Sequence, residues 1–204
     1  MITLIQQGGI VMGLILAAGL LVLGVFLERF LHLHRARIKT EDFIRGVCNI
    51  LTSQHIDEAL SICEETPGPV ARLMSAAIKH RDQEHHLMVQ AMDSVALTEI
   101  TRLERRLGIL ATVAQIAPLL GLLGTVLGMI QTAWVFMQQA PLVQAGDLAG
   151  GVWQALLATA AGLVVAIVSY IGYNWLVAKV EIIVLDMERA AGEISSFFMS
   201  AAAA

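Results

Sequence analysis

Two threonines are the side chains whose type and position could do chemistry in this sequence. Thr125 lies in a run without Asp, Glu, Lys or Arg from Leu107 to Gly146, and Thr159 lies in a second such run from Leu148 to Ala178. A hydroxyl can hydrogen-bond a proton carrier, but it does not titrate near neutral pH. The pair could therefore line a proton path only with a carboxylate from elsewhere. The alternative is structural, because threonines in membrane helices often bond back to their own backbone.

The histidines and cysteines do not form a catalytic or metal-binding pattern. His32 and His34 are two residues apart and do not share a helix face, which favours interfacial polar residues over a metal site. Cys48 and Cys63 lack a CxxC spacing, so reduced packing residues are expected. Three further histidines fall on a charged segment and are expected to be solvated: His80, His85 and His86. The sequence has no phosphate-binding loop or nucleophile motif, so we expect no enzyme, cofactor or metal.

Small residues accompany both threonines at steps of three and four, which is typical of one face of a helix. In the first run this face contains Pro118, Gly121, Thr125, Gly128 and Thr132. In the second run it contains Ala155, Thr159, Gly162, Ala166 and Ser169. Such faces are suited to contact with another helix or with water. Because about 20 apolar residues span a bilayer, both runs are predicted to be transmembrane helices joined by an outer turn.

Composition and charge independently indicate an integral membrane protein. The chain has 204 residues, of which 57% are hydrophobic and 15% charged, and its mean hydropathy is +0.72. All thirteen Lys and Arg lie between Arg29 and Arg106 or at Lys179 and Arg189. By the positive-inside rule these segments are cytoplasmic, which predicts three spans with the N-terminus outside and the C-terminus inside. The first apolar run has no cation before it, so it is interpreted as a retained span and not as a secretory signal.

We therefore predict an all-α integral membrane protein. Its segments are an outer N-terminal segment 1–9, a first span 10–30, a cytoplasmic helical region 31–106, a second span 107–138, an outer turn 139–147, a third span 148–178, and a cytoplasmic C-terminal helix and tail 179–204. Helical periodicity continues from about Glu84 into the second span, which predicts one unbroken helix of about 50 residues. The third span continues past Lys179 in an apolar stripe, so both spans are expected to extend into a cytoplasmic helical stem.

The cytoplasmic region contains one strong helix breaker. It is Thr66-Pro67-Gly68-Pro69, and Pro69 is predicted to begin the next helix. The apolar face of that helix contains Val70, Leu73, Met74, Ala77 and Ile78. Upstream, Thr40 followed by Glu41 and Asp42 predicts a helix N-terminus with a capping hydroxyl and acids in the first turn.

The chain resembles the MotA/TolQ/ExbB proton-channel family, and within it the ExbB and TolQ members. In the second span the resemblance is carried by Ala117-Pro118 through Gly124-Thr125-Val126-Leu127-Gly128. In the third span it is carried by the segment from Gly151 to Ile167, including Thr159, and by Tyr173-Asn174. Near the start, Gly9, Met12 and the pair Glu28-Arg29 also fit. The resemblance runs nearly from end to end.

The resemblance implies a proton-channel subunit of a motor in the bacterial inner membrane. It assigns Thr125 and Thr159 to the pore lining and makes Gln154 a candidate for the pore mouth, where many relatives have Glu. Gln cannot take up or release a proton in that role. Many relatives also have a proline after the position of Ile167, which this chain lacks. The positions expected to pack helices or face a partner are Pro118, Gly121, Gly128, Ala155, Gly162 and Ala166.

The implied partners supply the carboxylate that the uncharged runs of this chain lack. The chain would form a homopentamer around a dimer of an ExbD/TolR-like single-span protein, whose helix supplies the aspartate. A TonB- or TolA-like protein would carry the work of the proton-motive force to outer-membrane transport or envelope maintenance. The lipid bilayer is the remaining partner, and no nucleic acid is expected.

Two other classes of function remain open from the residues. The first is a non-conducting membrane scaffold that stabilises a single-span partner, with the small-residue faces serving only for packing. The second, and least favoured, is a membrane enzyme that uses the histidines. The residues also do not decide whether the chain is an ExbB, a TolQ or a more distant motor protein, or whether the ion is H⁺ or Na⁺. The transported substrate and the identity of the partner are open as well.

Overall fold

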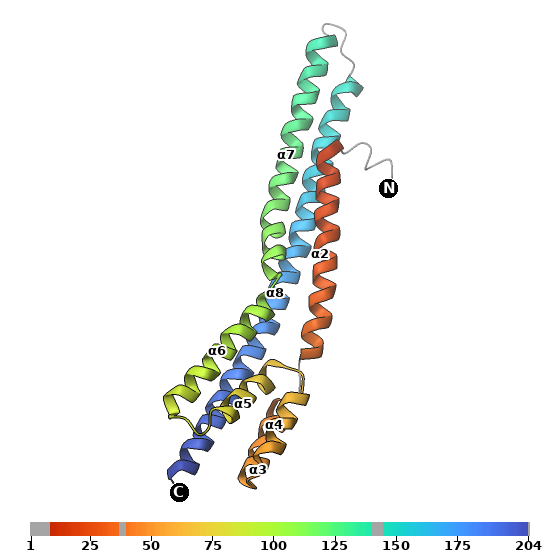
Figure 1. Ribbon diagram of the computed structural model, residues 1–204. Helices are drawn as coiled ribbons and strands as arrows, with labels where there is room; N and C mark the ends of the chain where they lie inside the picture. The colour runs from red at the N-terminus through yellow and green to blue at the C-terminus, as the bar shows by residue number, and fades with distance from the viewer. Residues whose placement is uncertain (1–8, 37–39, 140–144, 204) are drawn as a thin grey trace. The chain divides into compact units, whose positions relative to one another are not determined.

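The computed structural model describes residues 9–36, 40–139 and 145–203, and these residues form helices and no strands (Figure 1). In chain order the helices are α2 (Gly9–Ala36), α3 (Thr40–Thr52), α4 (Ile56–Glu65), α5 (Pro69–Lys79), α6 (His85–Glu104), α7 (Leu107–Gln139) and α8 (Ala145–Ala203). The chain divides into two compact units. The first contains the chain up to Glu28 and Arg106–Trp175, and the second contains Arg29–Arg105 and the chain from Leu176 onward.

The first unit is built from apolar helices whose outer faces remain uncovered. Three helices are long and apolar enough to cross a membrane, with candidate spans at Val11–Leu31, Leu107–Gln138 and Ala149–Ser200. Large apolar side chains are widely exposed on these helices, including Leu20 at 71% and Leu119 at 63%. Such a surface suits contact with lipid and is unusual for a soluble monomer. The prediction of an all-α membrane protein with three apolar spans is confirmed.

The interior of the first unit is made largely of small side chains. Ala117, Ala158 and Ser169 are almost completely buried. Helix α2 packs on α8, because a Cβ at Gly19 would meet Val165 Cγ2 at 3.3 Å and one at Gly172 would meet Phe26 at 3.1 Å. Helices without large side chains between them approach closely, which is how association is stabilised where lipid removes the hydrophobic driving force.

The second unit has an ordinary apolar core around α5. All the residues predicted for its apolar face are buried: Val70, Leu73, Met74, Ala77 and Ile78. Pro69 begins α5, as predicted, and the preceding Gly68 adopts a φ of 143° that only glycine tolerates easily. The stripe predicted on α8 also points inward, since Val180, Ile183, Met187 and Ala190 are buried.

Helix α3 begins and ends with contacts of different kinds. Thr40 is its first residue, and the Thr40 hydroxyl donates a hydrogen bond to Asp186 of α8 over 3.2 Å. At the other end, Gln54 adopts a φ of 60° and the His55 amide donates to the Ile50 carbonyl. This last arrangement is a Schellman motif, which ends a helix by satisfying its last carbonyls.

The prediction of one unbroken helix from about Glu84 through the second span is wrong. Helix α6 ends at Glu104 and α7 begins at Leu107. Between them Arg106 has a φ of 70°, a left-handed conformation that costs a non-glycine residue about 1–2 kcal/mol. The Arg106 guanidinium pairs with the carboxylate of Glu28, which lies within α2. Periodicity within one segment carries no information about this distant carboxylate.

Candidate functional site

The candidate site is the contact face between α7 and α8 in the first unit, which we call the seam. On α7 it contains Ala117, Gly121, Gly124, Gly128 and Thr132. On α8 it contains Gly151, Ala155, Ala158, Thr159 and Gly162. At these residues the two helices approach each other closely. The two long uncharged runs of the sequence therefore meet along the small-residue faces that they carry.

The seam has no room for a side chain at its glycines. A Cβ at Gly162 would lie 2.6 Å from the Ala117 carbonyl oxygen, and one at Gly121 would lie 3.0 Å from Thr159 Cα. A Cβ at Gly128 would lie 2.8 Å from Ala155 Cβ. These distances are shorter than van der Waals contact, so any larger residue would push the two helices apart. The glycines are thus required by packing, whatever else the seam does.

Thr159 is the polar group that joins the two helices. Its Oγ1 donates to the Gly121 carbonyl oxygen of α7 over 3.1 Å and lies 3.4 Å from the Ala155 carbonyl oxygen of its own helix. The side chain is half-buried, so one side of it remains accessible. A hydroxyl that donates to a carbonyl keeps lone pairs that can accept a hydrogen bond from a protonated carboxylic acid.

Thr125 follows Gly124 of the seam in the sequence. It is half-buried, and its Oγ1 donates to the Leu122 carbonyl oxygen of its own helix over 2.6 Å. The structure therefore places Thr159 at the contact between α7 and α8, whereas the Thr125 hydroxyl bonds only within α7. That both line a pore remains a prediction.

The other predicted site residues have less specific positions. Gln154 is half-buried on α8, and Pro118 is half-buried inside α7. Ala166 is 8% exposed, one turn beyond Gly162. Farther along α8, Ser169 is fully buried, and its Oγ donates to the Val165 carbonyl oxygen over 2.6 Å. The roles predicted for Gln154 at a pore mouth and for Pro118 and Ala166 toward a partner also remain predictions.

Sequence reasoning missed several members of the seam. Gly124, Ala158, Ala117 and Gly151 all lie in the seam, but they entered the sequence argument only within the segments that carry the resemblance and not as members of the small-residue faces. Gly124 follows Gly121 by three residues and precedes Gly128 by four, so the same spacing rule could have found it. Ala158 is less conspicuous, because alanine is common throughout these spans.

The site has no titratable group of its own along the seam. The sequence has no Asp or Glu between Leu107 and Gly146 or between Leu148 and Ala178. The polar groups that the structure describes on the seam are therefore hydroxyls and backbone carbonyls. Such groups can relay a proton or coordinate an ion, but a group that titrates and carries the proton must be supplied by another molecule.

The histidines and cysteines are used locally in the second unit. His80 Nδ1 lies 2.9 Å from the Ala76 carbonyl oxygen at the end of α5, and His86 pairs with Glu84 over 3.1 Å. The side chains of His32 and His34 lie outside the described residues. Burial raises the pKa of the Cys63 thiol to about 11, and it raises that of Cys48 as well. Among the described residues, no three His, Cys, Asp or Glu side chains gather as metal ligands would.

Three apolar helices and a glycine-lined seam with two threonines define a multi-span membrane protein built for close helix contact. Residues 65–189, which cover more than half of the chain, match the model of the MotA/TolQ/ExbB proton channel family. The chain therefore belongs to this family. The matched region includes α5, α6, α7 and the part of α8 that carries Thr159.

Individual relatives agree with this assignment. The chain is 29% identical over 177 residues to an ExbB homolog of Methanothermobacter thermautotrophicus, covering 86% of this chain and 62% of the relative. It is 49% identical over 94 residues to the biopolymer transport protein ExbB of Aquifex aeolicus, covering 46% and 63%. It is 40% identical over 98 residues to the Tol-Pal system protein TolQ of Haemophilus influenzae, covering 48% and 42%. The chain thus spans less than two thirds of the length of these relatives.

Proposed function

We propose that this chain is the ion-path subunit of an inner-membrane motor driven by the proton-motive force. The observation that carries the proposal is the seam itself, which places a half-buried hydroxyl between two helices whose spans contain no carboxylate. A proton path built on this chain needs a titratable group from a partner. Membership of a proton-channel family supports a conducting role.

The proposed partner is an ExbD/TolR-like single-span protein whose transmembrane helix brings an aspartate to the seam. Thr159 donates to the Gly121 carbonyl and can accept from the protonated form of that aspartate. This chain would hold the protonated aspartate of the partner, and the proton would leave that aspartate on the other side of the membrane. One charge moving through about 100 mV releases about 2.3 kcal/mol, so a few protons are enough to drive a modest rearrangement.

The proposed assembly is a homopentamer around two copies of the partner, with the N-terminus outside and the C-terminus in the cytoplasm. The work would pass to a TonB- or TolA-like protein for outer-membrane transport or envelope maintenance. The relatives include a biopolymer transport protein and a Tol-Pal system protein, which supports both outer-membrane transport and envelope maintenance as destinations. The proposal includes no catalytic reaction and no cofactor.

The first experiment is the native mass of the detergent-extracted complex, measured for the chain alone and with an ExbD-like neighbour co-expressed. We expect a ring of five copies that takes up two partner chains. The purified complex is then placed in liposomes with a trapped pH-sensitive dye, and proton uptake is measured under an imposed potential. A monomer or dimer that ignores the partner would contradict the proposal.

A non-conducting scaffold is the second candidate, and one observation favours it. The hydroxyls of Thr125, Thr132 and Ser169 all donate to carbonyls of their own helix, as purely structural threonines and serines do. A scaffold would assemble with the partner but would give no proton uptake in the liposome experiment. Repeating the experiment with a trapped Na⁺-sensitive dye identifies the ion.

A further inference from the structure

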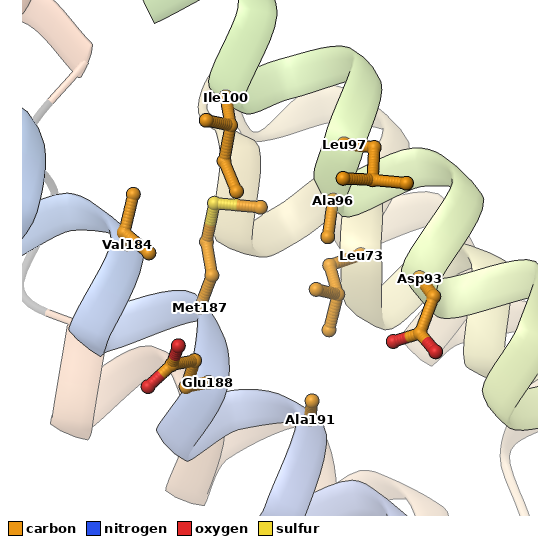
Figure 2. A pocket seen from close by; sticks show the side chains of 9 residues that line it. All are labelled: Leu73, Asp93, Ala96, Leu97, Ile100, Val184, Met187, Glu188 and Ala191. Atoms are coloured by element: carbon orange, nitrogen blue, oxygen red, sulfur yellow. The ribbon is translucent and has the colours of Figure 1, made fainter.

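A groove in the second unit lies away from the seam and has no role in the proposed function. It lies between α6 and α8, has a volume of about 390 Å³, and is floored by Leu73 of α5 (Figure 2). Its apolar walls include Leu97 and Ile100 of α6 and Val184 and Met187 of α8.

The apolar part of this groove is not fully covered by the chain itself. Leu97 is 67% exposed on the α6 wall, whereas Met187 opposite it is only 2% exposed and forms part of the core. Covering the apolar surface of an exposed leucine favours binding. The groove therefore offers apolar surface that a second molecule could bury.

Two carboxylates lie in the walls of the groove. Figure 2 shows Asp93 on α6 and Glu188 on α8, with the small Ala191 between them. Both acids are exposed, and neither has an ion pair with any residue that the structure describes. Two other acids of the same unit are paired, since Glu99 contacts Arg72 at 2.6 Å and Glu64 contacts Lys79 at 2.7 Å. The acids beside the groove are therefore available to an external cation.

We propose that this groove docks a basic amphipathic helix of another polypeptide on the cytoplasmic side. Apolar anchors at helical spacing would cover Leu97, and Lys or Arg side chains on the flank would reach Asp93 and Glu188. Long basic side chains suit such a place, because their stems bury against apolar surface while their charges meet the carboxylates. This inference rests on the groove and on the predicted orientation, and it holds whether or not the seam conducts protons.

The two acids oppose a two-fold contact of this groove with a second copy of the chain. A two-fold contact made by this groove with itself would bring Asp93 and Glu188 of one copy against the same acids of the other. Like charges facing each other oppose association. Phosphate-rich ligands are disfavoured for the same reason.

The test uses the full chain in nanodiscs of phosphatidylcholine, which has no net charge. The probe is a fluorescent synthetic helical peptide of about 14 residues, with leucines at i, i+3, i+4 and i+7 and lysines on the flanks. Anisotropy titration is expected to show binding that weakens with salt. The double variant Asp93→Asn with Glu188→Gln should bind about tenfold more weakly, the loss expected for two exposed ion pairs. Ala191→Phe should prevent binding by filling the groove.

The matched control removes one exposed carboxylate from each of the same two helices outside the groove. This variant is Glu104→Gln with Glu181→Gln, and it should bind as the unchanged chain does. The proposal would be overturned if the unchanged chain did not bind the peptide, or if a peptide with glutamates in place of the lysines bound as tightly. It would also be overturned if empty nanodiscs bound the peptide as tightly as those with the chain, or if both double variants lost the same affinity for the peptide. A drop in native mass caused by Ala191→Phe would also overturn it, because the occupant would then be a second copy.

Discussion

At the scale of single residues, Thr159 differs from every other hydroxyl that the structure describes in the first unit. Its hydrogen bond to the Gly121 carbonyl joins residues 38 apart in sequence, whereas Thr125, Thr132 and Ser169 bond within their own helix. A hydroxyl between two helices can both hold them in register and present its oxygen to a third. The structural and the conducting role of Thr159 can be separated by substitution.

Replacing Thr159 by Val keeps the shape of the side chain and removes the hydroxyl. We expect the complex to assemble with a loss of stability of about 1 kcal/mol, the usual net value of one hydrogen bond. Partner-dependent proton uptake should fall to background in the liposome experiment. Thr112→Val is the control, because the exposed Thr112 hydroxyl bonds only the Gly108 carbonyl of its own helix. If assembled Thr159→Val complexes still take up protons, the hydroxyl is structural.

The Cys63 thiol should be nearly unreactive at neutral pH. Burial raises its pKa to about 11, with smaller contributions from Cys48 and Glu64. Because the folded chain favours the neutral thiol, the contribution of Cys63 to folding stability is complete below the ordinary thiol pKa of about 8.5. That contribution is lost as pH rises toward 11. In a Cys48→Ser chain, the reaction with a disulfide reagent at about pH 8 should be roughly a hundredfold slower than for a free thiol. Fast reaction without denaturant would contradict the burial.

At the scale of elements, the distance between α7 and α8 is set by glycines. The same seam glycines that permit the Thr159 hydrogen bond also prevent any side chain from entering between the helices. Substitution of a seam glycine therefore tests packing without changing any polar group.

Gly162→Ala should destabilise the pairing of α7 with α8. The new Cβ would lie 2.6 Å from the Ala117 carbonyl oxygen, and overpacking of this kind costs about 1–3 kcal/mol. Gly150→Ala is the matched control on the same helix, because a Cβ there meets nothing within 4 Å. That control should be neutral or gain up to about 1 kcal/mol from helix propensity. Thermal unfolding in detergent measures the stability of both variants. Equal unfolding midpoints for the two variants would contradict the close packing of the seam.

At the scale of the whole molecule, charge segregation predicts which segments lie in the cytoplasm. None of the thirteen cations falls within the runs Leu107 to Gly146 and Leu148 to Ala178, which leaves one orientation that satisfies the positive-inside rule. The position of each segment across the membrane is therefore open to chemical labelling.

Single cysteines in a chain without Cys48 and Cys63 should report this orientation. Gln138→Cys, at an exposed position near the end of α7, should react with a membrane-impermeant maleimide in intact spheroplasts. Gly192→Cys on α8, where a Cβ meets nothing within 4 Å, should react only after permeabilisation. The reverse labelling pattern would contradict the orientation and place the groove of the second unit outside the cell.

Much of this protein was predictable because the signals are local. The uncharged runs, the glycines and threonines at helical steps, and the Pro69 start of α5 depend on composition or on residues within a few turns. The apolar stripe of α8 was predictable for the same reason, since Val180, Ile183 and Met187 lie on one side of a helix and are buried. The family followed from the same residues.

The sequence by itself thus determined the class of protein, the three apolar spans and the small-residue faces of two of them. The tertiary structure alone decided that the helix breaks at Arg105 and Arg106, where Glu28 pairs with the Arg106 guanidinium across 78 residues. It also decided that Thr159 bonds Gly121, and that Asp93 and Glu188 line one groove. The physical reason is that periodicity reports which face a residue occupies, whereas an ion pair, an interhelical hydrogen bond or a groove depends on a partner far away in the sequence.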